Sequence, residues 1–139
     1  MLFGVGCDLC EVARMEQSLF GPHGLALEAR VFGRAEREAL ALDECRAGEN
    51  GRKQAHRAAS AAADFAAKEA FLKAAGTGLR EPFSLCEIEA VRLPSGAPMY
   101  RFSGKTAEWV AERKLNAHLS LSHDGGMAMA FCVLEQAET

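Results

Sequence analysis

The chain has 139 residues, of which 49% are hydrophobic and 25% are charged, a composition that predicts one globular domain over residues 1–139 with one sizeable core. It has no run of eighteen apolar residues, and its N-terminus lacks the basic and long apolar segments of a signal peptide, so we expect a cytoplasmic protein without a membrane span. The formal net charge of −3 argues against broad binding to nucleic acid, which depends on a basic surface.

The N-terminal residues 2–9 alternate in hydropathy and are predicted to form a half-buried strand. One face carries glycines at positions 4 and 6 and ends in Asp8. Glycine on a strand leaves room for another group to come close, although it also marks bulges and tight crossings. The other face carries Phe3, Val5, Cys7 and Leu9.

The five cysteines are odd in number and scattered through apolar segments, which favours reduced thiols over a disulfide framework. Cys7 and Cys10 form a C-x-x-C pair, but residues three apart on a strand point to opposite faces. No second C-x-x-C or nearby Cys/His pair completes a zinc site. We interpret these cysteines as packing residues.

The middle of the chain is predicted to be mainly helical. The polar segment A-G-E-N-G-R-K-Q at 47–54 is predicted to be an exposed loop between two helices. The alanine-rich helix after it ends at Gly76-Thr77-Gly78, where glycine suits a left-handed cap. The predicted helices are residues 11–19, a short stretch up to 30, 34–46 and 56–75.

The C-terminal half is predicted to contain two hairpins separated by a helix, so the fold class is α+β rather than doubly wound α/β. The phosphate-binding patterns G-x-x-x-x-G-K-[ST] and G-x-G-x-x-G are absent, so phosphate binding would need another device. The predicted strands are 83–93, 99–103, 118–123 and 127–135, with a helix at 105–114 and an Asp124-Gly125-Gly126 turn in the second hairpin.

Glu69 lies on the same helical stripe as Phe65 and Leu72, so we expect it to be partly desolvated and to need a partner. The usual partners of such a carboxylate are a lysine or a metal ion, and Lys68 and Lys73 flank it. An ordinary i, i+4 ion pair between Glu69 and Lys73 explains the same spacing.

Asp8 and Glu69 together offer the hard oxygen ligands that Mg²⁺ prefers, with water and a substrate phosphate filling the other positions. Lys73, one turn beyond Glu69, is placed to neutralise a phosphate oxygen. Asp8 equally fits a cap at the start of the next helix. His123, beside the Asp-Gly-Gly turn, equally fits a hydrogen-bonded or merely exposed histidine at a strand end.

Three motifs occur in one order: G-V-G-C-D-L-C-E-V, F-A-A-K-E-A-F-L-K-A-A-G-T-G-L and H-L-S-L-S-H. Together with R-V-F at 30–32 and S-G-K at 103–105, they resemble the holo-[acyl-carrier-protein] synthases of the 4'-phosphopantetheinyl transferase superfamily over nearly the whole chain. The resemblance implies an antiparallel sheet packed against the alanine-rich helix, in a homotrimer with its sites at subunit interfaces.

The activity that the resemblance implies is transfer of 4'-phosphopantetheine from coenzyme A to a serine of apo acyl carrier protein, which releases adenosine 3',5'-bisphosphate and serves fatty acid biosynthesis. By position in the motifs, Asp8 and Glu69 would be ligands of Mg²⁺, and Lys73 would contact phosphate. Glu69, or a water that it orients, is a candidate base for the attacking serine.

The same resemblance assigns three further residues. Lys68 matches the lysine of the K-E pair and would assist in binding coenzyme A, while His123 matches a histidine expected at the 3'-phosphate of coenzyme A. Arg14 matches a basic position in the surface that receives the acidic carrier protein.

The sequence also departs from the family pattern. Asp64 stands where many members have arginine, and the turn at 124–126 lacks the usual Thr-Lys pair, so two basic contacts are missing. Cys10 stands where larger relatives have a third acidic metal ligand, and residues 47–60 are longer than in compact members. A module of the same fold that binds coenzyme A or a carrier protein without catalysis remains one alternative, and a purely structural oligomer remains another.

Overall fold

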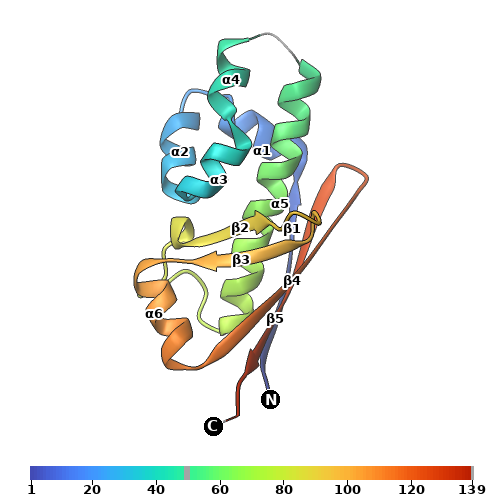
Figure 1. Cartoon of the computed structure of the whole chain (residues 1–139). Helices are drawn as coiled ribbons and strands as arrows, with labels where there is room; N and C mark the ends of the chain where they lie inside the picture. Colours follow the sequence, from blue (N-terminus) through green and yellow to red (C-terminus); the bar gives the residue numbers. More distant parts are fainter. Residues whose placement is uncertain (49–50, 139) are drawn as a thin grey trace.

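The computed structural model describes residues 1–48 and 51–138 and has the predicted α+β class. It contains a three-stranded antiparallel sheet in the order β1-β5-β4 and a separate hairpin of β2 and β3 (Figure 1). The strands are β1 (Leu2–Glu11), β2 (Ile88–Arg92), β3 (Pro98–Phe102), β4 (Leu115–Asp124) and β5 (Met127–Gln136). The helices are α1 (Val12–Leu19), α2 (Gly24–Val31), α3 (Arg34–Leu40), α4 (Leu42–Ala47), α5 (Gly51–Ala75) and α6 (Gly104–Glu112), with a 3-10 turn at Leu85–Glu87.

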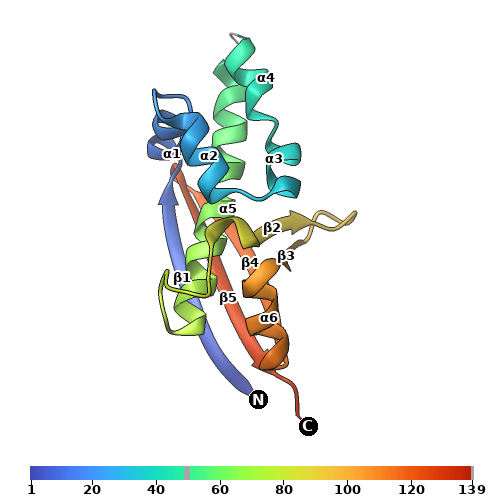
Figure 2. The same ribbon diagram turned by 90° about the vertical axis from the view of Figure 1, so that its left-hand side faces the viewer.

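The long helix α5 is the element around which the others pack. Helices α1 to α4 gather around its N-terminal half, and the sheet runs along its C-terminal half (Figures 1 and 2). No helix in the described part of the chain is long and apolar enough to span a membrane.

The glycines of β1 allow this strand to lie directly against α5. A Cβ atom added at Gly4 would come within 1.9 Å of the Ala74 carbonyl oxygen, and one added at Gly6 would come within 1.9 Å of the Ala70 carbonyl oxygen. Side chains do not tolerate such contacts with a backbone, so only glycine fits at both positions. Of the alternatives that the glycine face leaves open, the close approach is therefore observed, and the register of β1 against β5 also shifts between Leu2 and Gly4.

The apolar face of β1 points away from the helix. The strand is half-buried as predicted, but its buried side is the glycine side, and α5 covers only that face of the sheet. On β5, alternate residues from Ala128 to Leu134 are buried under α5. The other face exposes Phe3 (39%), Val5 (50%), Leu9 (58%), Met129 (36%) and Phe131 (41%).

Two apolar clusters hold the elements together. The first surrounds Phe71 of α5, whose ring centroid lies 4.9 Å from that of Phe102 and 5.6 Å from that of Phe83. The second packs Leu19, Phe32 and other side chains of the N-terminal helices against the small alanines of α5. Alanine allows these neighbours to approach the helix axis closely, which fits the alanine-rich composition.

Some predicted boundaries are wrong. Helix α5 begins at Gly51, so residues 51–54 are helical rather than part of a loop. Arg, Lys and Gln are good helix formers despite their polarity. Glu49 and Asn50 lie outside the described residues. The predicted helix at 34–46 is two helices, divided at Ala41, which adopts a left-handed conformation with φ of 46°. The strand predicted at 83–93 begins only at Ile88.

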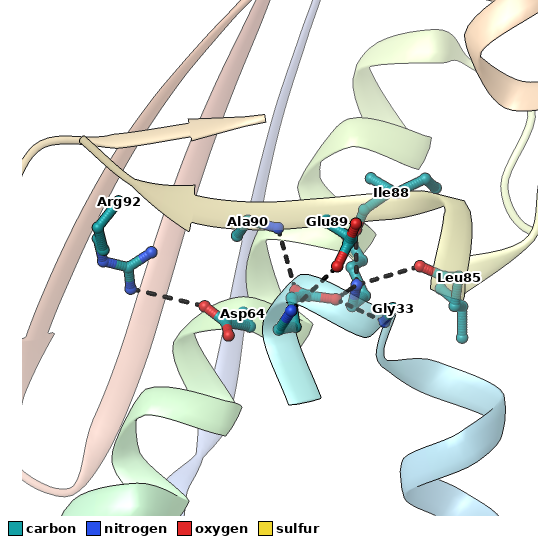
Figure 3. Close-up of polar contacts among 9 residues, drawn as sticks. Gly33, Asp64, Leu85, Ile88, Glu89, Ala90 and Arg92 are labelled. Atoms are coloured by element: carbon teal, nitrogen blue, oxygen red, sulfur yellow. Dashed lines mark hydrogen bonds and ion pairs between the residues drawn. The ribbon is translucent and has the colours of Figure 1, made fainter. Parts of the chain in front are cut away.

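A buried charge cluster joins α3, α5 and β2 (Figure 3). Glu36, Asp64, Lys68 and Glu89 are 1%, 5%, 0% and 6% exposed. The Lys68 ammonium binds the Glu36 carboxylate and donates to the carbonyl oxygen of Ile88 at 2.6 Å. Burial raises the pKa of Glu36 and lowers the pKa of Lys68, and their mutual attraction opposes both shifts.

Backbone donors complete this cluster. The Glu36 carboxylate accepts hydrogen bonds from the backbone N–H groups of Gly33 at 3.1 Å and Ala90 at 3.0 Å, and the Glu89 carboxylate accepts one from the Glu36 N–H at 3.0 Å. Both carboxylate oxygens of Glu36 and one of Glu89 therefore have protein donors, and such partners are what makes buried charge tolerable. The N-terminal helices are thereby tied to the hairpin.

Asp64 is the member of the cluster with the weakest compensation. Its Oδ1 lies 3.5 Å from Nη2 of Arg92, at the end of β2. Burial, followed by repulsion from Glu36, raises the pKa of Asp64 to about 7, and Arg92 and Lys68 only partly oppose this shift. Asp64 is therefore a carboxylate whose ionised form the fold disfavours near neutral pH.

Gly6→Ala is expected to destabilise the protein by about 3 kcal/mol, because the added methyl group would overlap the backbone of α5. Urea unfolding followed by circular dichroism measures the change. Gly51→Ala is the control, since a Cβ atom there meets nothing within 4 Å and should be neutral or slightly stabilising. Equal stability of Gly6→Ala and the original chain would contradict the packing of β1 on α5.

Asp64→Asn is expected to be more stable than the original chain above pH 7. At pH 4 this advantage should be absent. Between the ordinary pKa of 3.8 and the folded value of about 7, the folded state keeps a proton that the unfolded state has lost, so the stability of the original chain falls as pH rises through this window. The variant lacks this loss, which is at most about 4 kcal/mol.

Urea unfolding of both proteins between pH 4 and pH 8 measures this difference. Asp43→Asn is the control, because the Asp43 side chain is 83% exposed and should show no such trend. A difference between Asp64→Asn and the original chain that stays constant with pH would show that burial does not disfavour the Asp64 carboxylate.

Candidate active site

Asp8 and Lys73, two of the predicted site residues, are in contact. The Lys73 ammonium donates to Asp8 Oδ1 at 3.0 Å and to the Cys7 carbonyl oxygen at 2.9 Å. The Asp8 side chain is 20% exposed and the Lys73 side chain is 55% exposed, so the pair faces solvent at the edge of the packed layers. The glycine contact of β1 with α5 sets these side chains opposite each other.

Glu69 lies one helical turn before Lys73 and is half-buried. Its pKa is raised, first by burial and then by repulsion from the Asp8 carboxylate, while Lys73 lowers it. The repulsion shows that the two carboxylates are close enough to interact. The partial desolvation that the helical stripe predicts for Glu69 is confirmed.

The Asp8 and Glu69 carboxylates fit a hard divalent cation. Such an ion would relieve their repulsion, and Mg²⁺ commonly uses one or two carboxylates and completes its shell with water and phosphate oxygens. Within residues 1–48 and 51–138, no group of three or more His, Cys, Asp or Glu side chains is placed to hold a metal ion. Asp8 and Glu69 are thus a two-carboxylate set, to which water and phosphate oxygens would be added.

Cys10 does not supply a third ligand of the same kind. It lies two residues beyond Asp8 on the same face of β1 and is half-buried. Burial, followed by the Asp8 charge, raises the pKa of the Cys10 thiol. The side chain is thus held as a neutral thiol, which is a poor ligand for a hard cation.

Lys68 lies apart from these residues, although it precedes Glu69 directly. It is fully buried, and its ammonium binds the Glu36 carboxylate and the carbonyl oxygens of Leu85 and Ile88. An ammonium has three N–H donors, and this geometry uses all of them. The structure thus corrects the assignment of Lys68 to coenzyme A binding, because no donor is left for a ligand.

His123 is also separated from the carboxylates within one chain. It pairs with Ala128 of β5, which pairs with Cys10 of β1, so a whole strand lies between His123 and the strand of Asp8. His123 instead lines a cleft of about 610 Å³ with residues of α5, β2 and the β4–β5 turn. The sequence motifs alone did not show this separation.

Arg14 is exposed on α1, at the rim of a second cleft of about 300 Å³. The floor of this cleft is apolar and includes Met15, Phe32 and Phe65. Cys10 also lines it, so the cleft begins next to the strand that carries Asp8. A basic rim beside an apolar floor suits contact with an acidic protein surface.

Arg92 is the residue of this region that sequence reasoning missed. It ends β2 and, by strand alternation, projects on the same side as Ile88 and Ala90. A signal was present, because an aspartate at position 64 among buried alanines needs a cationic partner. The sequence did not indicate which of the many arginines would supply it.

Residues 4–132 match the family model of the 4'-phosphopantetheinyl transferase superfamily. The chain is 43% identical over 136 residues to a holo-[acyl-carrier-protein] synthase of Trichlorobacter lovleyi, covering 97% of this chain and 98% of the relative. It is 36% identical over 135 residues to the protein of the same name from Leptothrix cholodnii, covering 97% of each.

Solved structures of similar proteins share the fold. The holo-[acyl-carrier-protein] synthase of Neisseria meningitidis superposes with a TM-score of 0.77 at 27% identity, over 98% of this chain and 100% of that one. The synthase of Bacillus anthracis in complex with CoA (3',5'-ADP) superposes with a TM-score of 0.72 at 30% identity, over 99% of both chains. The chain therefore belongs to the 4'-phosphopantetheinyl transferase superfamily.

Proposed function

We propose that the protein is a magnesium-dependent holo-[acyl-carrier-protein] synthase. It transfers 4'-phosphopantetheine from coenzyme A to a serine hydroxyl of apo acyl carrier protein and releases adenosine 3',5'-bisphosphate. The observation that carries the proposal is the grouping of Asp8, Glu69 and Lys73 at one edge of the fold, in a chain of this superfamily. The relatives named holo-[acyl-carrier-protein] synthase, and solved complexes with coenzyme A, support both substrates.

Asp8 and Glu69 would hold Mg²⁺, which would supply positive charge beside the pyrophosphate of coenzyme A. Lys73 adds a second cation beside them, and its contact with the Asp8 carboxylate raises the pKa of the Lys73 ammonium. The lysine therefore stays protonated and can neutralise an oxygen of the phosphate that is transferred.

The serine oxygen forms a bond to the phosphorus on the pantetheine side, and the bond from that phosphorus to the oxygen of adenosine 3',5'-bisphosphate breaks. The serine proton passes to Glu69 or to a water that Glu69 orients.

The functional form is a homotrimer with the site between subunits. The exposed apolar face of the sheet, formed by Phe3, Val5, Leu9, Met129 and Phe131, favours burial against further copies of the chain. Such an assembly would let His123 of one copy approach the carboxylates of another, which β5 prevents within a chain. Analytical ultracentrifugation that finds only monomers at micromolar concentration would contradict the trimer.

Glu69→Gln is expected to lower the rate of transfer about 100-fold or more, because it removes a charge from the metal site and the base while nearly conserving volume. The measurement is the intact mass of apo acyl carrier protein after incubation with coenzyme A and the enzyme, with Mg²⁺ or with chelator. The original chain should add one phosphopantetheine arm only with Mg²⁺.

Glu108→Gln, on the exposed surface of α6, is the matched control and should keep full activity. Full activity of Glu69→Gln would refute the role of Glu69 at the metal site. A folded original chain that binds coenzyme A without modifying any carrier protein would instead favour a non-catalytic binding module.

Arg14→Glu is expected to raise KM for the carrier protein about tenfold, because the charge reversal repels an acidic surface. The affinity for coenzyme A should stay within twofold, since Arg14 lies outside the cleft that contains His123. Steady-state kinetics with varied carrier protein, and calorimetry with coenzyme A, measure the two effects. Equal losses in both would show that α1 does not form the docking surface.

A further inference from the structure

The cleft of about 610 Å³ that contains His123 lies outside the group of Asp8, Glu69 and Lys73, none of which lines it. Its volume lies in the range of small-molecule sites. Its walls come from α5, from the β2–β3 hairpin and from the β4–β5 turn. The polar side chains that line it are those of His56, Ser60, Arg92, Ser122, His123 and Asp124.

The chemistry of these side chains suits an anion. A guanidinium, two imidazoles and two hydroxyls all offer hydrogen-bond donors, and among the residues that line the cleft only Asp124 is acidic. Arg92 carries the one permanent positive charge of the set. A phosphate monoester, which is doubly charged and has three acceptor oxygens, is the group that uses such a set best.

Arg92 is held at the wall of this cleft by Asp64 (Figure 3). The Asp64 side chain is 8% exposed and the Arg92 side chain is 38% exposed, with Nη2 of Arg92 lying 3.5 Å from Asp64 Oδ1. Among the residues that the structure describes, Asp64 is the only acceptor recorded for Arg92. One end of the guanidinium therefore faces the buried carboxylate, while other N–H groups remain for a ligand.

The buried ionisable groups next to Asp64 bear on its ion pair with Arg92. Three carboxylates, those of Glu36, Asp64 and Glu89, are buried together with one ammonium, that of Lys68. The cluster thus holds more carboxyl groups than ammonium groups, and Arg92 at its outer edge favours the ionised form of Asp64. Asp64 also lies on the same stripe of α5 as His56 and Ser60, at intervals of four residues, so it supports the wall that these two side chains form.

The substrate of the proposed function contains one phosphate that matches this position. Coenzyme A carries a pyrophosphate, which must lie at the reacting carboxylates, and a separate 3'-phosphate on the ribose. The cleft is not lined by Asp8 or Glu69, so it suits the 3'-phosphate rather than the pyrophosphate. The Asp64 carboxylate cannot contact that phosphate favourably, because both groups are anions.

Building on the proposed function, we propose that Arg92, positioned by Asp64, binds the 3'-phosphate of coenzyme A. Arg92 thereby selects coenzyme A over 3'-dephospho-coenzyme A, and the acid at position 64 serves to orient a cation from the neighbouring hairpin. His56 and His123 line the same cleft and add donors around the phosphate.

Calorimetry with coenzyme A and with 3'-dephospho-coenzyme A, on the full chain with Mg²⁺, tests this assignment. Arg92→Ala is expected to raise the Kd for coenzyme A at least tenfold and to leave the Kd for 3'-dephospho-coenzyme A within twofold, because only the former carries the phosphate. Arg101→Ala is the control, since Arg101 is an exposed arginine of the same hairpin that does not line the cleft; it should change neither value.

Asp64→Asn tests the positioning role. It is expected to raise the Kd for coenzyme A about threefold in the original chain and to have no effect in the Arg92→Ala background, since it acts through Arg92. A purely structural effect of Asp64 would persist in that background and would overturn its role. Arg92→Gln, which keeps most of the side-chain volume, replaces Arg92→Ala if thermal unfolding shows the latter to be misfolded.

Two negative results are distinguishable. If the original chain binds neither ligand and transfers nothing, the proposed function fails, and this assignment fails with it. If the original chain binds coenzyme A more tightly than 3'-dephospho-coenzyme A, and Arg92→Ala keeps the same preference or weakens both ligands equally, the proposed function stands and the assignment of Arg92 is overturned.

Discussion

The contact of β1 with α5 is the constraint on which the rest of the structure depends. Because Gly4 and Gly6 have no side chains, the strand backbone approaches the helix backbone more closely than any other residue would allow. This spacing brings Asp8 to Lys73 and within electrostatic reach of Glu69. It also turns the apolar side chains of β1 outward, so the same two glycines define both the edge that carries the proposed site and the uncovered face of the sheet.

Two adjacent residues of α5 show how one helix serves two tasks. Lys68 and Glu69 are separated by about 100° around the helix axis. Lys68 turns inward and closes a buried charge cluster with Glu36, while Glu69 turns toward Asp8. The first residue fixes how α3 and the β2–β3 hairpin sit against the helix, and the second belongs to the proposed metal site. Helix α5 therefore carries a buried ammonium whose charge the Glu36 carboxylate compensates.

Much of this arrangement was predictable from the sequence, because local patterns determine it. Alternation predicted β1, and the order of motifs predicted the family and the pairing of Asp8 with Glu69. The partners of buried charges were not predictable, since they depend on contacts between residues distant in the chain: nothing near Lys68 in the sequence indicates Glu36, and nothing near Asp64 indicates Arg92. The extension of α5 to Gly51 was missed because polarity was read as a loop signal, although the residues are good helix formers.

The uncovered apolar face has a thermodynamic consequence. If copies of the chain bury Phe3, Val5, Leu9, Met129 and Phe131 against one another, association stabilises only the folded state, so mass action couples folding to the amount of protein present. The midpoint of thermal unfolding then rises with protein concentration. A dilute chain, such as one just released from the ribosome, is correspondingly less stable and carries a hydrophobic surface open to chaperones until it meets its partners.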